Sequence, residues 1–409
     1  MAMTGARPTG QCLSSRGSWI GSRFAVRHVG RLATLIVTVA LLSGCTNPAT
    51  DVTATSATLN GTVTLKPSEH GTFWWEYSRD DGATWTQTAH ENWGVQTSSC
   101  DGSGLESPPA PISKSVTGLA PGAHYIFRLA GTKCGSGVEY LDSSGVEYPD
   151  SNGIAGGTAY DSFDTPPAGF STLQSSVSDG FNGPAGSQPT AKWNFNSWCN
   201  VPSKDQSDSC FLTDPQHISL DGNGLLHLRA IRDFVDSGGA VWHTWTAGQL
   251  VSKDQSIQPP YAFIVRAKVA PDYGFWSAPA WAWVNQGQTG EIDNIEQLGR
   301  QPTGVNQSVH NLGPGITRFT DLGGAPLAND FHVYAAYVYT DHADYFVDGT
   351  RTATITSTDA NGWSGIIGPT QFLISLTTGA CDGTPTWAGC PTNQQPHEEL
   401  VDWFRVYTP

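Results

Sequence analysis

Charged residues are scarce in this 409-residue sequence, at 14% against about 25% in an ordinary soluble protein. Basic residues are especially few, because 21 Lys and Arg stand against 36 Asp and Glu, for a net charge of −15. Such a chain lacks the basic surface that binds nucleic acid or anionic lipid, so we expect neither as a partner. The 15 Trp, 46 Gly and 26 Pro argue against disorder, a coiled coil or a helical protein.

The apolar run near the N-terminus, residues 32–42, is too short to cross a bilayer as a helix. It follows a basic segment, since the first 50 residues hold five Arg and no acidic residue. This order is typical of an export signal, so residues 1–45 are predicted to be a signal peptide and the protein to be exported. From residue 51 onward 16 Lys and Arg face 36 Asp and Glu, a net charge of −20.

The predicted signal ends in Leu42-Ser43-Gly44-Cys45, which resembles the lipobox of bacterial lipoproteins. In that family the peptide is cut before the Cys and the sulfur is acylated. The resemblance implies a lipid on Cys45, which would be the chain's only attachment to a membrane and would make it a cell-surface lipoprotein. The alternatives are an uncut anchor, or an ordinary cleavage site with an incidental Cys and a secreted product.

Cysteine spacing typical of zinc sites, such as CxxC, is missing from the sequence. Six Cys remain beyond the signal, and an even number in an exported chain indicates disulfides. Six Cys allow fifteen connectivities, and proximity along the chain favours three local pairs. These predicted pairs are Cys100 with Cys134, Cys199 with Cys210, and Cys381 with Cys390.

A Pro/Gly-rich stretch at residues 164–169 is predicted to link two β-modules, residues 46–166 and 170–409. In the first, residues 57–63 alternate apolar and polar side chains as a half-buried strand does. Residues 116–128 resemble the late-strand signature of fibronectin type III domains, which implies a small sandwich with a structural role for Tyr125. Four Trp could bind sugar, although packing is their commoner use: Trp74, Trp75, Trp85 and Trp93.

The second module also carries alternating strand patterns, at residues 263–269, 332–339 and 400–406. Turn signals at residues 221–224 and 348–349 separate such strands. About 240 residues of short strands predict one large sandwich or jelly roll, so the whole exported chain is expected to be all-β.

The densest chemical signal is Glu291, Asp293 and Glu296 within six residues of a charge-poor module. On a regular strand Glu291 and Asp293 share one face with Ile295, whereas Glu296 points away. A one-residue β-bulge between Asp293 and Glu296 would bring all three carboxyls together. The residues alone leave three interpretations open: a retaining glycosidase with two carboxyls, a calcium site, and an inert acidic edge strand.

The flanking sequence resembles glycoside hydrolase family 16, in the bulged, laminarinase-like branch whose motif is E-x-D-x-x-E. The resemblance rests on residues 274–283 before the acids and on further blocks in family order. It implies a β-jelly roll with an open cleft that cuts internal β-1,3 linkages of glucans with retention, without a cofactor. Those further blocks are residues 247–253, 331–349, 371–376 and 400–407.

Carried over by position, Glu291 is the expected nucleophile and Glu296 the acid that then becomes the base. Asp293 between them is expected to hydrogen-bond a neighbouring carboxyl and to help keep Glu291 ionised while Glu296 holds its proton. Asn294 replaces a usually apolar residue, lies on the opposite face and is expected to affect packing only.

Three residues beside the acids are candidate substrate contacts. Indole rings stack on the apolar faces of sugars, so Trp276 and Trp281 are predicted platforms, with core packing as the alternative, which has more weight for Trp283 than for the other two. The family usually spaces this pair four residues apart, whereas here the spacing is five. His310 follows the acidic strand where the family often places a His, with an ordinary polar role as the alternative.

Many relatives hold a structural calcium far from the cleft, and Asp402 with the turn at residues 179–183 matches that site loosely. The expected protein is a monomer acting on a β-glucan polysaccharide. Competing functions are a non-hydrolytic β-glucan-binding or wall-adhesion protein, and a family member acting on mixed-linkage glucan or galactan. The presence of both Glu291 and Glu296 argues against the binding-only class.

Overall fold

The computed structural model describes residues 43–409 except for short gaps. The chain divides into two compact units, Met1–Leu119 with His124–Thr165 and Ala120–Ala123 with Pro166–Pro409. The division at Thr165 falls inside the linker predicted at residues 164–169. Most of the predicted signal peptide lies outside the described residues. The gaps are residues 65–66, 81, 95, 97–98, 102, 105–109, 136–137, 142–146, 149–160, 200–206, 208, 237–241, 285–289, 312–314, 360–362 and 382–386.

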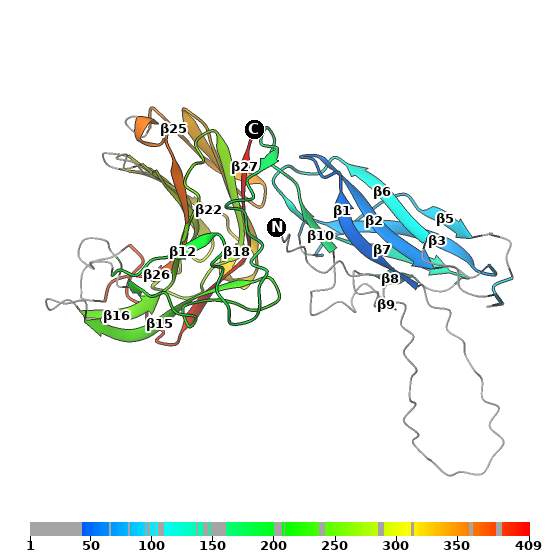
Figure 1. Ribbon diagram of the computed structural model, residues 1–409, viewed down its shortest axis with the longest axis horizontal. Coiled ribbons are helices and arrows are strands. Elements are labelled where there is room, and N and C mark those ends of the chain that lie inside the picture. Colours follow the sequence, from blue (N-terminus) through cyan, green and yellow to red (C-terminus); the bar gives the residue numbers. More distant parts are fainter. Residues whose placement is uncertain are drawn as a thin grey trace, which may run out of the picture. The chain divides into compact units, whose positions relative to one another are not determined.

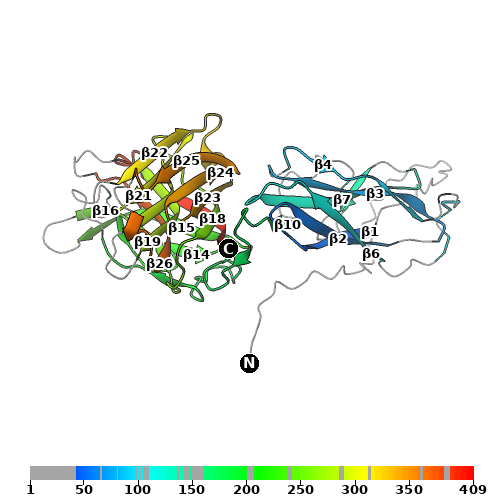
Figure 2. The same cartoon turned by 90° about the horizontal axis from the view of Figure 1, so that it is seen from above.

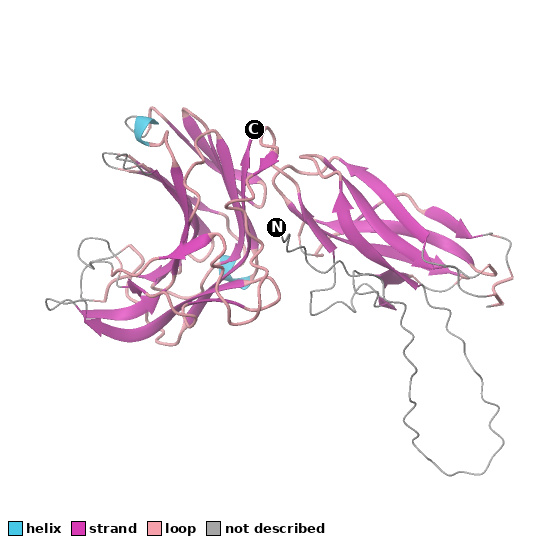
Figure 3. Cartoon of the chain, in the orientation of Figure 1, coloured by secondary structure: helices cyan, strands magenta, loops and turns pink. Residues whose placement is uncertain are grey.

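Strands dominate both units, as the composition predicted (Figure 3). The helices of the described residues are two single 3-10 turns, η1 (Leu327–Asn329) and η2 (Trp363–Gly365). None of the described helices is long and apolar enough to cross a membrane. The predicted all-β class is confirmed.

The first unit consists of a three-stranded sheet in the order β1-β2-β6 and a second sheet built around β3 and β7 (Figure 1). In β2 the predicted inward residues Ala57, Leu59 and Val63 are buried, at 2%, 0% and 2% exposure. The first sheet comprises β1 (Ser43–Thr50), β2 (Ser56–Thr64) and β6 (Ala110–Thr117). The second comprises β3 (His70–Ser78), β4 (Thr86–Gln87), β5 (Glu91–Gly94), β7 (His124–Lys133), β8 (Glu139–Leu141), β9 (Glu147–Tyr148) and β10 (Asp161–Asp164).

Aromatic side chains fill the interior of the first unit. Tyr125 stacks on Phe163 at 5.4 Å between ring centroids and is 6% exposed, so it serves packing as expected. Trp74, Trp75 and Trp93 are buried, and the half-buried Trp85 ring carries the Arg128 guanidinium at 4.0 Å. The four Trp therefore follow the packing alternative.

Cys45 lies in β1 opposite Thr62, with its side chain fully buried and disulfide-bonded. The strand begins at Ser43, so the last predicted signal residues belong to the sheet of the uncut chain. Lipidation of Cys45 after cleavage remains a prediction.

The second unit is a sandwich of a ten-stranded and a seven-stranded sheet, both strongly curved (Figures 1 and 2). The larger sheet comprises β11 (Thr172–Leu173), β13 (Ser209–Phe211), β14 (Ile218–Leu220), β15 (Leu226–Asp236), β16 (Trp242–Ala247), β18 (Tyr261–Lys268), β23 (His332–Val338), β24 (His342–Val347), β25 (Thr350–Thr356) and β27 (His397–Thr408). The smaller comprises β12 (Trp193–Phe195), β17 (Gln249–Ser252), β19 (Phe275–Val284), β20 (Glu291–Leu298), β21 (Gly304–His310), β22 (Ile316–Asp321) and β26 (Thr370–Thr378), in the order β12-β17-β26-β19-β20-β21-β22.

The core lies between these two sheets. Phe372 of the smaller sheet meets Phe263 of the larger at 5.6 Å, and both rings are fully buried. Core residues alternate with residues that point to the other face of the smaller sheet: in β17 and β26, Leu250 and Ile374 are core residues, whereas Gln249 and Ser375 are not. We call the face opposite the core the site face.

All three predicted cysteine pairs are disulfides in the structure. Each links segments close in sequence, at separations of 34, 11 and 9 residues. The pairs are Cys100–Cys134 in the first unit, and Cys199–Cys210 and Cys381–Cys390 in the second.

Candidate active site

The three acids lie on β20, and a β-bulge brings them onto the site face. The pairing of β20 with β21 runs in register through Asp293 and shifts before Glu296, which is the predicted bulge position. Asp293 and Glu296 are 3% and 5% exposed, and Glu291 is more open. The carboxyl groups of Asp293 and Glu296 are therefore held in a nearly dry environment, with the more open Glu291 beside them.

The bulge exists because two successive residues of β20 face the core. Ile295 is fully buried in the apolar interior. Asn294 is also fully buried, and its Nδ2 donates to the backbone oxygens of Phe263 and Tyr334 in the opposite sheet, at 3.3 and 3.2 Å. With both residues turned inward, the next side chain, Glu296, emerges on the site face. Asn294 thus lies opposite the acids, as expected, and anchors the bulge.

Burial raises the pKa of both glutamates well above the ordinary value. For Glu296 the charges of Asp293 and Glu291 raise the pKa further, while a 3.0 Å hydrogen bond donated by the Ser308 hydroxyl to Oε2 opposes this. For Glu291, Asp293 raises the pKa through its charge and a hydrogen bond. The charge of Asp293 therefore opposes ionisation of Glu291, because like charges disfavour ionisation, and the expected help of Asp293 in keeping Glu291 ionised stays a prediction.

His310 lies directly opposite Glu291 in the pairing of β20 with β21. Its Nε2 is 3.2 Å from Oδ2 of Asp293, and this contact raises the pKa of the imidazole, although burial opposes the rise. The ring is backed by Gly315, where a Cβ would lie 1.9 Å from His310 Nδ1. The predicted His310 is thus part of the acidic cluster, and the glycine leaves room for it.

The predicted indoles also lie beside the acids. Trp281 pairs with Asp293, and its Nε1 donates to Ser375 Oγ at 3.1 Å; Trp276 meets Trp387 edge to face at 5.3 Å. Both Trp276 and Trp281 are half-buried, as is Trp283 opposite Glu291, so the core expectation for Trp283 is wrong.

The five-residue spacing of Trp276 and Trp281 has a structural explanation. Residues five apart on a regular strand point to opposite faces. In β19, however, the register with β26 shifts between Ala278 and Trp281, which pair with Ser375 and Leu373. This second bulge adds one residue and returns Trp281 to the face that carries Trp276.

At the weakly predicted calcium position, Asp402 and the turn at residues 179–183 make contacts within the chain. The Asp402 carboxylate accepts from Arg266 Nη1 at 2.8 Å, so a cation already neutralises it. In the loosely matching turn, the Asp179 carboxylate accepts from Trp193 Nε1 and from the Phe181 backbone. Both carboxylates thus have hydrogen-bond partners within the chain, and calcium at this position stays a prediction.

Several polar residues of the site were missed in the sequence. Ser308 holds Glu296, and Tyr345 from the opposite sheet donates its hydroxyl to the Ser308 carbonyl at 2.9 Å. Asn306 pairs with Glu296 across the bulge. Serine and asparagine are common in any β-protein, and only the pairing of β21 with β20 could have indicated them.

Part of the chain, mostly in the second unit, is similar to known proteins. Residues 212–405 match the model of glycosyl hydrolases family 16. The chain is 26% identical over 266 residues to glucan endo-1,3-beta-glucosidase A1 of Niallia circulans, covering 56% of this chain and 37% of that protein. It is 27% identical over 183 residues to a beta-glucanase of Rhodothermus marinus, covering 40% of this chain and 62% of that protein.

The match thus spans less than two thirds of either curated relative. Among solved structures, the endo-beta-1,3-glucanase from Pyrococcus furiosus matches with a TM-score of 0.50 and 24% identity. The match covers 58% of this chain and 94% of that one. The second unit therefore has the same sandwich fold.

Proposed function

We propose that residues 170–409 form a retaining endo-glycoside hydrolase that cleaves internal β-1,3 linkages of laminarin-like β-glucans. The carrying observation is the β20 bulge, which gathers Glu291, Asp293 and Glu296 on one face. The family match over residues 212–405 and the curated endo-1,3-beta-glucosidase relative support the substrate class.

In the first step the Glu291 carboxylate attacks the anomeric carbon while the glycosidic C–O bond breaks. Glu296 gives its proton to the leaving oxygen, for which the raised pKa of this buried carboxyl suits it. In the second step Glu296 takes a proton from water, whose oxygen attacks the anomeric carbon and releases Glu291. The reaction uses carboxyl chemistry throughout and requires no cofactor.

Asp293 contributes by its position between the two glutamates. It raises the pKa of both, so the cluster retains a proton at a pH where isolated glutamates would be ionised. Once the Glu291 proton is lost, the negative charge it leaves further favours the protonated form of Glu296. The cluster then has one ionised nucleophile and one protonated acid, which is the state that the first step needs.

The test is azide rescue of two alanine variants with an aryl β-glucoside substrate. For Glu296→Ala, azide should attack the intermediate on Glu291 and give a β-glycosyl azide. For Glu291→Ala, azide should replace the nucleophile and give the α-glycosyl azide. Each Gln variant should also lose about three orders of magnitude or more in kcat. The same anomer from both variants, or full activity of a Gln variant, contradicts the assignment.

A second candidate is a hydrolase acting on another polysaccharide, such as mixed-linkage glucan or galactan. The second curated relative is a beta-glucanase, a name that specifies no linkage, and this favours testing other polysaccharides as substrates. Release of reducing ends from laminarin, lichenan and galactan by the purified protein separates these substrates. Binding without release from any of them would favour the binding or adhesion class.

For the remaining chain we propose a fibronectin type III-like first unit and an exported, monomeric protein anchored through Cys45. Support for the first unit comes from its three-stranded sheet β1-β2-β6 beside the sheet built on β3 and β7. Mass spectrometry of the mature N-terminus tests the anchor. An unmodified N-terminus downstream of Cys45 would exclude lipidation.

A further inference from the structure

Ser308 lies at the centre of a row of hydrogen bonds that begins at Glu296. It belongs to β21 and pairs with Asp293 of β20 on one side and with Thr317 of β22 on the other. Paired residues of neighbouring strands point to the same face, so Ser308 and Thr317 share the site face with the acids. The Ser308 hydroxyl is 3.0 Å from Glu296 Oε2 and 3.0 Å from Thr317 Oγ1. The row therefore crosses from β20 through β21 to β22.

The packing around Ser308 holds its backbone in place. Its side chain is fully buried, and its backbone carbonyl accepts from the Tyr345 hydroxyl at 2.9 Å. Tyr345 is itself fully buried in the core between the two sheets. Strand β21 is also paired on both sides, with β20 and with β22. The main freedom left to the Ser308 hydroxyl is the direction in which its proton points.

Counting protons gives the direction of each hydrogen bond in this row. A serine or threonine hydroxyl has one proton to donate, whereas an ionised carboxylate can only accept. When Glu296 is ionised, Ser308 therefore donates to Oε2 and accepts from Thr317. Thr317 lies at the exposed end of the row and supplies that proton.

The same order decides which oxygen of Glu296 carries the proton in the acid form. While Ser308 donates to Oε2, the proton of the carboxylic acid resides on Oε1, because a protonated oxygen is the poorer acceptor. A proton on Oε2 would require the whole row to reverse, and it would then point at Ser308 on β21. Only the first order leaves the proton of Glu296 for a glycosidic oxygen.

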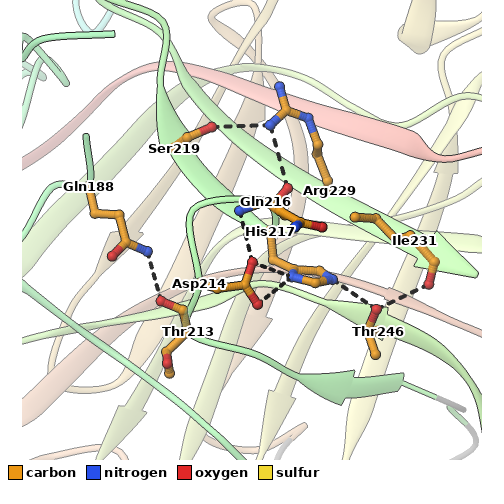
Figure 4. Close-up of polar contacts among 9 residues, drawn as sticks. All are labelled: Gln188, Thr213, Asp214, Gln216, His217, Ser219, Arg229, Ile231 and Thr246. Carbon is orange, nitrogen blue, oxygen red and sulfur yellow. Dashed lines mark hydrogen bonds and ion pairs between the residues drawn. The ribbon is translucent and has the colours of Figure 1, made fainter. Parts of the chain in front are cut away.

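A second buried hydroxyl of this unit follows the same rule in a structural setting. Thr246 of β16 is fully buried and donates to the backbone carbonyl of Ile231 at 3.2 Å, a group that can only accept (Figure 4). It therefore accepts from His217 Nε2 at 2.8 Å, and His217 Nδ1 contacts Asp214 at 3.0 Å. Thr246 belongs to the larger sheet, whereas the acids lie on the smaller one, so it provides a matched control.

We propose that Ser308 is a positioning residue for the acid: oriented by Thr317, its hydroxyl holds Oε2 of Glu296 and places the transferable proton on Oε1. The inference rests on the proposed function, because Glu296 must be the acid for the position of its proton to matter. A sugar is a poor leaving group and departs only with a proton, whereas dinitrophenolate departs without one. The dependence on leaving group therefore separates positioning of the acid from general damage to the site.

The test compares Ser308→Ala with the wild type on laminarin and on a dinitrophenyl laminaribioside. Ser308→Ala should lower kcat/KM about thirtyfold on laminarin and leave it within about threefold on the dinitrophenyl substrate. The basic limb of the pH profile on laminarin should shift to higher pH, because burial and the neighbouring charges then raise the pKa of Glu296 without the opposing hydrogen bond from Ser308.

Two further variants test the row itself. Ser308→Thr keeps a hydroxyl at this position and should restore both the activity on laminarin and the pH profile. Thr317→Val should cause a loss of the same kind, about threefold on laminarin and none on the dinitrophenyl substrate. Because Thr317 is exposed, this variant tests the row even where Ser308→Ala does not fold.

Thr246→Ala is the control for loss of a buried hydroxyl. It should lower the free energy of unfolding and leave the ratio of the two kcat/KM values at the wild-type level. An equal loss on both substrates for Ser308→Ala, full activity of Ser308→Ala on laminarin, or no recovery in Ser308→Thr would overturn the proposal and leave the proposed function intact. A wild-type protein that cleaves neither substrate contradicts the proposed function itself, and the role of Ser308 with it.

Discussion

His310 Nε2 lies 3.2 Å from Asp293 Oδ2, which joins β21 to the central acid of β20. The groups that face the imidazole are acidic: Asp293 in contact and Glu291 opposite it in register. The pKa of His310 is raised, mainly by this contact with Asp293. Below that pKa, the imidazolium offsets the negative charge that raises the pKa of Glu291 and Glu296.

Replacing His310 with Asn should shift the pH profile of kcat/KM to higher pH. Without the cation, the carboxyls of Glu291 and Glu296 ionise less readily, so their pKa values rise further. On the acidic limb, where Glu291 must ionise, kcat/KM at a given pH should fall about tenfold. The basic limb should also shift to higher pH. The measurement is kcat/KM on laminarin against pH.

His342→Asn is the matched control for this change. His342 is half-buried and also contacts an aspartate, Asp341 at 2.6 Å, but it lies on β24 of the larger sheet. Its profile should coincide with that of the wild type. A His310→Asn profile that only drops in height, without moving along the pH axis, would assign His310 to sugar binding alone.

Gly315→Ala should reproduce the His310→Asn profile without removing the histidine. The new Cβ would lie 1.9 Å from His310 Nδ1, so the ring must leave its place against Asp293. Gly368→Ala is the control, because its Cβ would meet only a Val284 methyl at 3.0 Å. A Gly315→Ala protein with a wild-type profile would show that the contact with Asp293 is dispensable.

Two adjacent glutamates of β27 should give opposite pH dependence of stability. Glu399 is fully buried, and burial raises its pKa well above the usual value. The folded state therefore binds a proton that the unfolded state loses, so stability falls as pH rises from the unfolded pKa toward the folded one. Glu399→Gln should remove this loss and raise the free energy of unfolding at neutral pH.

Glu398 should behave in the opposite way. Hydrogen bonds from His227 and Arg229 lower its pKa to about 2 despite partial burial. Its contribution is present above the unfolded pKa and disappears as pH falls toward about 2. Glu398→Gln should therefore lower stability at neutral pH and leave it unchanged in strong acid. Chemical denaturation over a pH series measures both variants, and parallel curves for the two would contradict the assignment.

Loss of a buried ion pair should lower the stability of the first unit more than loss of a half-exposed pair does. Arg128 Nη2 contacts Glu76 Oε2 at 2.5 Å, with both side chains 2% exposed. Glu76→Gln leaves the guanidinium buried without its counter-charge and should cost about 3–5 kcal/mol. Glu91→Gln breaks the half-exposed pair with Lys114 and should cost less than about 1 kcal/mol. Denaturant titration of the full chain distinguishes them; equal small losses would contradict the difference expected from burial.

The strand pattern and the identity of the acids could be predicted from the sequence because both depend on residues that are close together along the chain. Alternation in residues 57–63 predicted the buried side of β2, and nearness along the chain predicted the disulfides. The motif from Glu291 to Glu296 is local too, so its bulge could be anticipated. Trp283 lies two residues after Trp281 and shares its face, so alternation alone could have placed it outside the core; the bulge in β19 decides that both share the face of Trp276.

What the sequence by itself determined was an all-β chain with a compact carboxylate cluster, because strand period and residue chemistry are local properties. Only the tertiary structure decided which distant residues meet those carboxyls. Ser308 and His310 reach them because β21 pairs with β20, and Thr317 reaches Ser308 because β22 pairs with β21. Such contacts arise from strand order and register across the sheet, which no stretch of sequence encodes alone.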